Sequence, residues 1–200
     1  SPVTSNEINP VVIYNTPGTY EVSLKVTNGD GSDSKVCPQY IKIFNLESFI
    51  DQRDGSLYRT VQIGNQTWMF DNLKFQTTSG SCFYNNKQMY DTVYGRLYDW
   101  TTAKTACPQG WHLPSDAEWN ILITNTGGSN AACGLKEPTN IHWEAPNTST
   151  NVSGFTALPG GGKLSNAFYG INIKAYFWSN TSWGAADAWS FVLSFYSPDI

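Results

Sequence analysis

The side chains with the greatest chemical potential lie in "CPQGWHLPSDAEW", residues 107–119. A thiol, an imidazole and two carboxylates at this spacing could perform nucleophilic catalysis. In that arrangement Cys107 is the nucleophile, His112 the general base, and Asp116 or Glu118 the acid that orients the base. The elements around these residues decide whether they are positioned for such chemistry.

Those elements favour a structural corner. Ser115 followed three residues later by Glu118 is the signature of a capping box, and it predicts a helix through "DAEWNIL". Carboxylates in the first turn also face the positive end of the helix dipole, so Asp116 and Glu118 have a structural reason to be there. His112, flanked by large apolar residues, is expected to be packed or hydrogen-bonded. The residues predicted to build this corner are Trp111, His112, Pro114, Ser115, Glu118 and Trp119.

Composition narrows the function classes. The chain carries 12 Lys and Arg against 16 Asp and Glu, a formal net charge of -4. Nucleic acid is therefore not an expected partner, because phosphate binding needs clustered basic residues. Charged residues make up only 14%, against a usual value of about a quarter, and aromatic residues also make up 14%. This polar, aromatic-rich composition is typical of exported domains. No transmembrane segment is predicted, because no run of about 18 apolar residues occurs.

The sequence predicts no metal site and no cofactor. The only two histidines, His112 and His142, are not spaced as zinc ligands, and the cysteines form no CxxC pair. Export favours disulfides. The pairing stays open among Cys37, Cys82, Cys107 and Cys133.

Residues 1–45 are predicted to form a β segment. "TYEVSLKVT" alternates, which indicates a half-buried strand with Tyr20, Val22, Leu24 and Val26 on its apolar face. "NGDGS" predicts a turn, and "VCPQYIKIFN" the returning strand. The stretch "YNTPGTYEVSLKVTNGDGSDSK" resembles the C-terminal half of a PKD domain, an immunoglobulin-like sandwich. That resemblance implies a partial PKD-like segment.

Farther along, "LYRTVQIGNQTWMFDNL" predicts two strands around a turn at Gly64 and Asn65. "YGRLYDWTTAKTAC" has helical spacing, and the helix after Ser115 is expected to end at "TGG", 126–128. From residue 129 to "LSNAF" the chain predicts a long loop. Strands return at "AYFWSNTSW" and "AWSFVLSF", with Trp178 and Trp189 expected in the core.

Four motifs carry a second resemblance: "DGSLYRTVQIGNQTWMFDNLKF", "YGRLYDWTTAKTACPQGWHLPSDAEW", "GFTALPGGG" and "YFWSNTSW" with "AADAWSF". Together they resemble the Fibrobacter succinogenes major paralogous domain. The resemblance implies an α+β, C-type-lectin-like domain over 46–200, with two helices, small antiparallel sheets and a long loop region as the ligand face. It also implies export in a Bacteroidetes-type bacterium.

Sugar-binding C-type lectins hold calcium with a Glu-Pro-Asn tripeptide and a Trp-Asn-Asp. Here "KEPTN" supplies Glu137 and Asn140, and the nearest equivalent of the second motif is Asp187, so a calcium-free ligand face is expected. The candidate ligand-binding residues are Glu137, Asn140, Trp143, Asn147, Tyr169, Asn180, Trp183 and Asp187. Formylglycine-generating enzymes, which "WHLPSDAEW" also resembles, need a copper-binding cysteine pair that is missing here. No enzyme is predicted.

The sequence thus predicts an exported protein at the cell surface or outer membrane, for example a lipoprotein, that binds a glycan or surface protein. The alternative is a structural or fimbria-associated module whose partner is a neighbouring subunit. A calcium-dependent lectin is less favoured.

Proteins resembling this family close with a "GFSVRC"-like strand, whose cysteine is the expected partner of Cys107. This chain stops at "SFYSPDI". We therefore expect one of two outcomes: the chain is a fragment of a longer protein, or the strand at 58–63 is paired by residues 11–45 or by a strand from another subunit.

Overall fold

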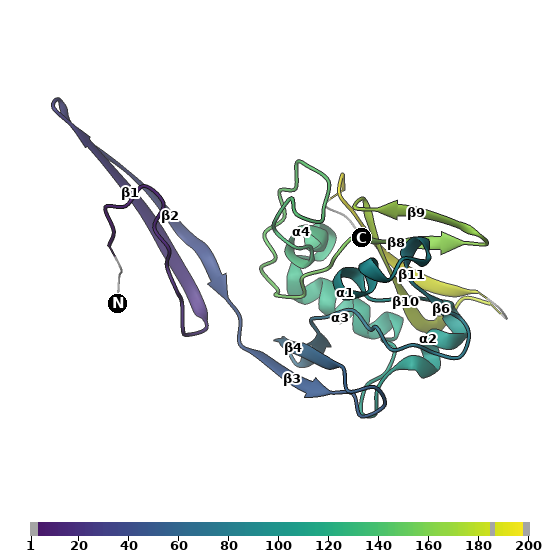
Figure 1. Cartoon of the computed structure of the whole chain (residues 1–200). Coiled ribbons are helices and arrows are strands. Elements are labelled where there is room, and N and C mark those ends of the chain that lie inside the picture. Colours follow the sequence, from purple (N-terminus) through teal and green to yellow (C-terminus); the bar gives the residue numbers. More distant parts are fainter. Residues whose placement is uncertain (1–3, 185–186, 198–200) are drawn as a thin grey trace. The chain divides into compact units, whose positions relative to one another are not determined.

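The computed structural model describes residues 4–184 and 187–197. The chain divides into two compact units, Ser1–Asn45 and Leu46–Ile200, which we describe separately (Figure 1).

The first unit is a β-hairpin of two long antiparallel strands, β1 (Gly18–Asn28) and β2 (Gly31–Ile43). The Asn28 side chain stabilises the turn, because its Oδ1 accepts hydrogen bonds from two following backbone N–H groups, at 2.9 and 3.1 Å. The predicted hairpin is therefore confirmed.

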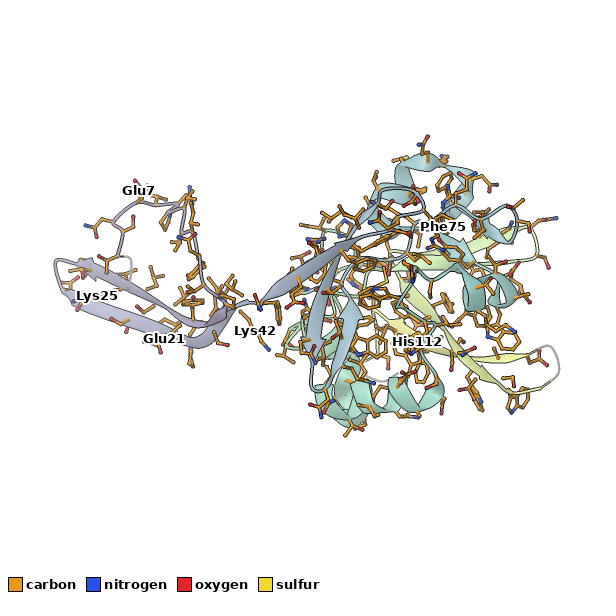
Figure 2. The ribbon with its side chains drawn as sticks, turned by 90° about the horizontal axis from the view of Figure 1, so that it is seen from below. Glu7, Glu21, Lys25, Lys42, Phe75 and His112 are labelled. Carbon is orange, nitrogen blue, oxygen red and sulfur yellow. The ribbon has the colours of Figure 1, made fainter. Side chains whose placement is uncertain are left out.

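The apolar face of this hairpin is largely uncovered. Leu24 is 64% exposed and Val26 is 56% exposed, so the prediction of a half-buried strand is wrong at these positions. The physical reason is that the described part of the unit builds one two-stranded sheet with no second sheet over it. On the opposite face, Glu21 and Lys25 are exposed, and their side chains stand away from the ribbon in Figure 2.

The second unit opens with a three-stranded antiparallel sheet in the order β3 (Leu46–Ile50), β4 (Leu57–Ile63), β5 (Gln66–Met69). The predicted strands on either side of Gly64 and Asn65 are confirmed. β4 is paired on both sides, by β3 over 57–61 and by β5 over 60–63. The expectation that 58–63 needs a strand from 11–45 or another subunit is therefore wrong, because the Leu46–Ile50 segment folds back onto β4.

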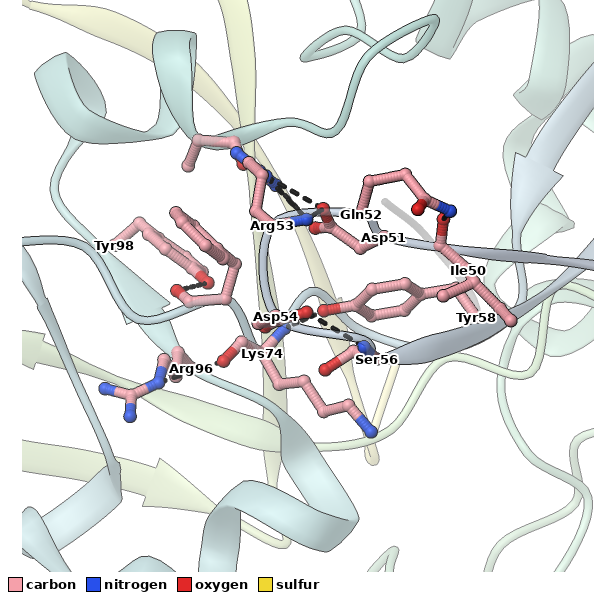
Figure 3. A network of polar contacts seen from close by, with 12 residues as sticks. Ile50, Asp51, Gln52, Arg53, Asp54, Ser56, Tyr58, Lys74, Arg96 and Tyr98 are labelled. Atoms are coloured by element: carbon pink, nitrogen blue, oxygen red, sulfur yellow. Dashed lines mark hydrogen bonds and ion pairs between the residues drawn. The ribbon is translucent and has the colours of Figure 1, made fainter.

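A tight turn makes this fold-back possible. Buried Asp51 donates its backbone N–H to Ser56 O at 2.8 Å, and its carboxylate forms an ion pair with Arg53 at 2.7 Å (Figure 3). The hydrogen bond from Arg53 keeps the pKa of Asp51 below its ordinary value. The Arg53 guanidinium also stacks on Phe75 at 3.7 Å and donates to Ala106 O at 2.9 Å. The turn is thereby tied to two later segments of the unit.

The middle of the unit holds short elements in the order β6 (Ser81–Cys82), η1 (Tyr84–Asn86), η2 (Gln88–Tyr90), α1 (Asp91–Tyr94), β7 (Leu97–Tyr98), α2 (Trp100–Ala106), α3 (Asp116–Thr126), η3 (Gly128–Asn130) and α4 (Ala131–Leu135). The helix predicted over 94–107 begins later than expected. Asp99 is its N-cap and accepts from Thr102 N at 2.7 Å, while Leu97–Tyr98 pairs with β6. The helix after Ser115 is confirmed, and Gly127 ends it.

A four-stranded sheet completes the unit, in the order β11 (Ala188–Ser194), β10 (Lys174–Ser182), β8 (Gly160–Leu164), β9 (Ala167–Ile171). The two strands predicted at the C-terminal end are confirmed. The predicted long loop is wrong in part, because it contains α4, β8 and the start of β9. β8 and β10 run parallel and are paired at one position, Ala175 opposite Gly161.

An aromatic cluster forms the core between α3 and the four-stranded sheet. The ring of Trp119 lies 4.9 Å from Trp68, 5.0 Å from Phe191 and 5.5 Å from Phe177. Because side chains alternate along a strand, Phe177 points to this core and the adjacent Trp178 to the opposite face.

Trp178 and Trp189 are 36% and 49% exposed, so their predicted place in the core is wrong. Helices and small sheets together give the second unit an α+β architecture. None of the helices in the described ranges combines the length and apolar character needed to span a bilayer.

Candidate functional site

The second unit contains a groove with a volume of about 1420 Å³. Its lining comes from β5, β7, α2, β8, β9 and β10 and from the 110–114 loop. The two central strands of the four-stranded sheet, β10 and β8, both contribute to this lining. We call it the aromatic groove, because tyrosine and tryptophan side chains from β5, β7, α2, β9 and β10 are among the residues that line it.

Three aromatic residues on the sheet side form what we call the platform: Tyr169, Tyr176 and Trp178. The rings of Tyr169 and Tyr176 meet edge to face, with centroids 5.5 Å apart. Both rings lie against Gly162, where a Cβ would be 3.1 Å from Tyr169 Cζ and 3.2 Å from Tyr176 Cδ2. Trp178 is fixed by its Nε1, which donates to Tyr98 O at 2.8 Å. Packing and hydrogen bonds therefore pre-position the platform.

Two further indoles that line the groove, those of Trp100 and Trp119, donate to backbone carbonyls of β10. Trp100 Nε1 donates to Ser179 O at 2.8 Å, and Trp119 Nε1 donates to Trp178 O at 3.3 Å. Asn180 N also donates to Pro114 O at 2.8 Å. The 107–119 segment thus supports one wall of the groove, which agrees with the structural role predicted for it.

The His112–Glu118 pair also lines the groove. His112 Nε2 lies 2.7 Å from Glu118 Oε1, while Glu118 Oε2 accepts from both N and Oγ of Ser115 at 2.8 Å. The predicted capping box is therefore confirmed. Burial opposes ionisation of Glu118, but the hydrogen bonds from Ser115 and His112 outweigh it and hold the pKa below its ordinary value. Both carboxylate oxygens are thus engaged, Oε2 in the cap and Oε1 with His112.

Cys107 lines the groove as a protonated thiol. Burial raises its pKa, and a thiol with a raised pKa is a weak nucleophile near neutral pH. In the described ranges, Cys37, Cys82, Cys107 and Cys133 are all free. The disulfides expected from export are therefore not formed in this structure. No three side chains of the His, Cys, Asp and Glu types gather as a metal site within those same ranges.

The predicted ligand residues of the 137–147 loop mostly hold the loop itself. Asn147 Nδ2 donates to Glu137 O at 2.6 Å, and Asn147 N donates to Asn140 Oδ1 at 2.8 Å. The Glu137 carboxylate lies 2.9 Å from His142 Nδ1. These polar groups already have partners within the loop, which leaves fewer of them to contact a ligand.

Trp143 does not lie on an exposed face. It is 1% exposed, and its Nε1 donates to Ala157 O at 2.9 Å. A wholly buried indole cannot contact a ligand, so this residue is a core residue.

The remaining predicted residues lie apart from that loop. Trp183 is 71% exposed and closes the β10–β11 hairpin, because its N–H donates to Asp187 O at 2.9 Å. Its ring lies 6.1 Å from that of Trp189. Asn180 and Asp187 are exposed. Of all the predicted ligand residues, Tyr169 alone lines the groove.

Sequence reasoning missed Tyr176, Trp178 and Gly162 as groove residues. Strict alternation along "KAYFW" could have found the first two, because it places Tyr176 and Trp178 on the face opposite Phe177. No sequence signal shows that Gly162 lies beneath two tyrosine rings.

No curated protein and no solved structure is significantly similar to this chain. A family model does match, over residues 61–197, and this stretch contains the groove, the capping box and the four-stranded sheet. The chain therefore belongs to the family of the Fibrobacter succinogenes major domain.

Proposed function

We propose that the second unit is a non-catalytic binding module with a C-type-lectin-like fold, which holds a glycan or protein ligand in the aromatic groove without calcium. The observation that carries this proposal is the groove itself, a concave space of about 1420 Å³ with a pre-positioned aromatic platform. Concave sites lined by aromatic side chains with a few polar groups are typical of ligand binding.

The polar chemistry around the groove supports binding over catalysis. Glu118 is engaged by Ser115 and His112, and Asp99 caps α2 through Thr102 N. Burial keeps the Cys107 thiol protonated. Acyl- or group-transfer catalysis needs an activated nucleophile and a free general base. Here the thiol is protonated, and both carboxylates already accept hydrogen bonds from the protein.

The low charge and the aromatic content support an exported, surface-exposed protein. We also propose that the hairpin of the first unit is part of a PKD-like segment. Export brings the groove into contact with glycans and with proteins of other cells.

Filling the groove tests this function. Ser190 lines the groove, is exposed and stands opposite Trp178 in the β10–β11 pairing. In Ser190→Trp, a large side chain should narrow the groove and weaken binding of ligands selected from a glycan array and a displayed-peptide library at least tenfold. Ser23→Trp, at an exposed strand position of the first unit, is the matched control. Unchanged binding in Ser190→Trp, with an intact fold, would exclude the groove as the ligand site.

A second candidate function is a structural module that contacts another subunit. The uncovered Leu24 and Val26 of the hairpin favour it, because an apolar strand face is ordinarily covered. Sedimentation of the purified chain tests it. Leu24→Ser and Val26→Ser should abolish any self-association that the unchanged chain shows, and they should leave groove binding intact.

A further inference from the structure

We propose that the ligand of the aromatic groove is a carbohydrate, whose pyranose rings stack on Tyr169 and Trp178. This inference rests on the proposed binding function and adds the chemical class of the ligand. It follows from the shape of the platform and the polar groups at its rim.

Two rings of the platform present apolar surface to solvent. Tyr169 is 41% exposed and Trp178 is 36% exposed. The edge-to-face contact between Tyr169 and Tyr176 covers at most one face of one ring, so ring surface stays open to a ligand. Pyranose rings offer a patch of C–H groups that fits such a surface.

Gly162 lets two tyrosine rings of the platform approach the sheet. The rings of Tyr169 and Tyr176 both lie against this residue, and they meet at an interplanar angle of 78°. The exposed rings of the platform therefore offer separate faces rather than one plane. A glycan can stack successive sugar rings on separate aromatic faces, here Tyr169 and Trp178, whereas a protein anchor usually fills a single deep, desolvated pocket.

Polar side chains that line the groove suit sugar hydroxyls. Ser165 and Ser190 are exposed, and Ser190 stands opposite Trp178 in the β10–β11 pairing. Serine hydroxyls both donate and accept, which matches the mixed donors and acceptors of a glycan.

Affinity electrophoresis of the full 200-residue chain tests this inference. The probes are β-glucan, xylan, galactomannan and polygalacturonate, each dissolved in a native gel, and titration calorimetry then gives Kd for any that retards the chain. We expect at least one of the four to retard it. Tyr169→Ala should weaken that binding at least tenfold, because it removes one stacking surface.

Two other variants sharpen the test. Gly162→Ala removes no aromatic ring but displaces both tyrosines by a few tenths of an ångström, so it should also weaken binding. Tyr40→Ala makes the same chemical change as Tyr169→Ala at a 69% exposed position of the first unit, and it should leave Kd within about twofold. Circular dichroism and thermal melting establish that each variant is folded.

The outcomes separate the ligand class from the binding function. Retardation by a polysaccharide that Tyr169→Ala or Gly162→Ala weakens supports the carbohydrate inference. If no polysaccharide binds but displayed peptides do, and Ser190→Trp blocks them, the ligand class is wrong and the binding function stands. Absence of both glycan and peptide binding overturns both. Polysaccharide binding that survives in folded Tyr169→Ala and Gly162→Ala overturns the stacking assignment.

Discussion

The capping box at the start of α3 should be a measurable source of stability. Glu118→Ala removes the acceptor that Ser115 N and Ser115 Oγ both reach at 2.8 Å, together with the contact to His112 at 2.7 Å. Loss of a cap costs about 0.5–2 kcal/mol. Because the Glu118 side chain is 34% exposed, water can partly replace its hydrogen bonds in the variant. We therefore expect the free energy of unfolding to fall by about 1 kcal/mol.

Ser115→Ala should cost about the same, because Ser115 Oγ accepts from Glu118 N at 3.3 Å in the same box. The double variant should lose less stability than the two single variants lose in sum, and the difference should be about 0.5–1 kcal/mol. Each single change already breaks the reciprocal pair of hydrogen bonds. Thr124→Ala, at an exposed position of the same helix, is the control and should cost nothing, because alanine is the better helix former.

The same carboxylate gives a pH test. Since the folded pKa of Glu118 lies below its ordinary value of 4.5, its contribution is present above pH 4.5 and is lost as the pH falls below that value. Urea unfolding followed by tryptophan fluorescence, at about pH 7 and about pH 3, measures it against Glu118→Gln. Strict additivity of the two alanine variants, or an equal Glu118→Gln deficit at both pH values, would refute the reasoning.

Three further predictions follow from the site and the core. Millimolar Ca²⁺ and EDTA should give the same Tm, because a bound ion would raise stability; a shift of several degrees would contradict the calcium-free proposal. Alkylation of the denatured, unreduced chain should add four labels, one per free cysteine, and a mass spectrum with fewer labels would contradict this. In the native chain, Cys107 should react slowly with the alkylating reagent, because burial raises the pKa of its thiol. The buried Lys136 has a pKa lowered by burial, so the stability of the unchanged chain relative to Lys136→Met should rise as the pH increases toward 10.5; the opposite slope in urea titrations would exclude this assignment.

Local chemistry made several elements predictable. Ser115 and Glu118 specify their helix start through side chains only three residues apart, and Gly64 with Asn65 specifies a turn in the same local way. These features depend on near neighbours in sequence, so they can be read without knowing the fold. The four family motifs are also short, continuous stretches of sequence, so the resemblance can be recognised without the fold. The family assignment over 61–197 agrees with it.

Strand partners were harder to foresee, because pairing depends on distant chain segments. The sequence shows that β4 is a strand but not that Leu46–Ile50 pairs with it. The sequence predicts a loop where the β8–β9 hairpin forms, because the glycines in "GGGKL" hide the alternation that identifies a strand.

The sequence alone therefore determined the hairpin of the first unit, the turn at Gly64 and Asn65, the helix cap, the acidic balance and the resemblance that identifies the family. Only the tertiary structure decided which aromatic residues face inward. Trp143 is buried because its indole reaches Ala157 O, and Trp178 is exposed because Phe177 takes the core position beside it. Tryptophans look alike in a sequence, and their exposure depends on strand alternation and on which distant surface packs against them. The groove depends on the tertiary structure for the same reason, since its lining comes from segments that lie far apart in the sequence, between Asn65 and Ser190.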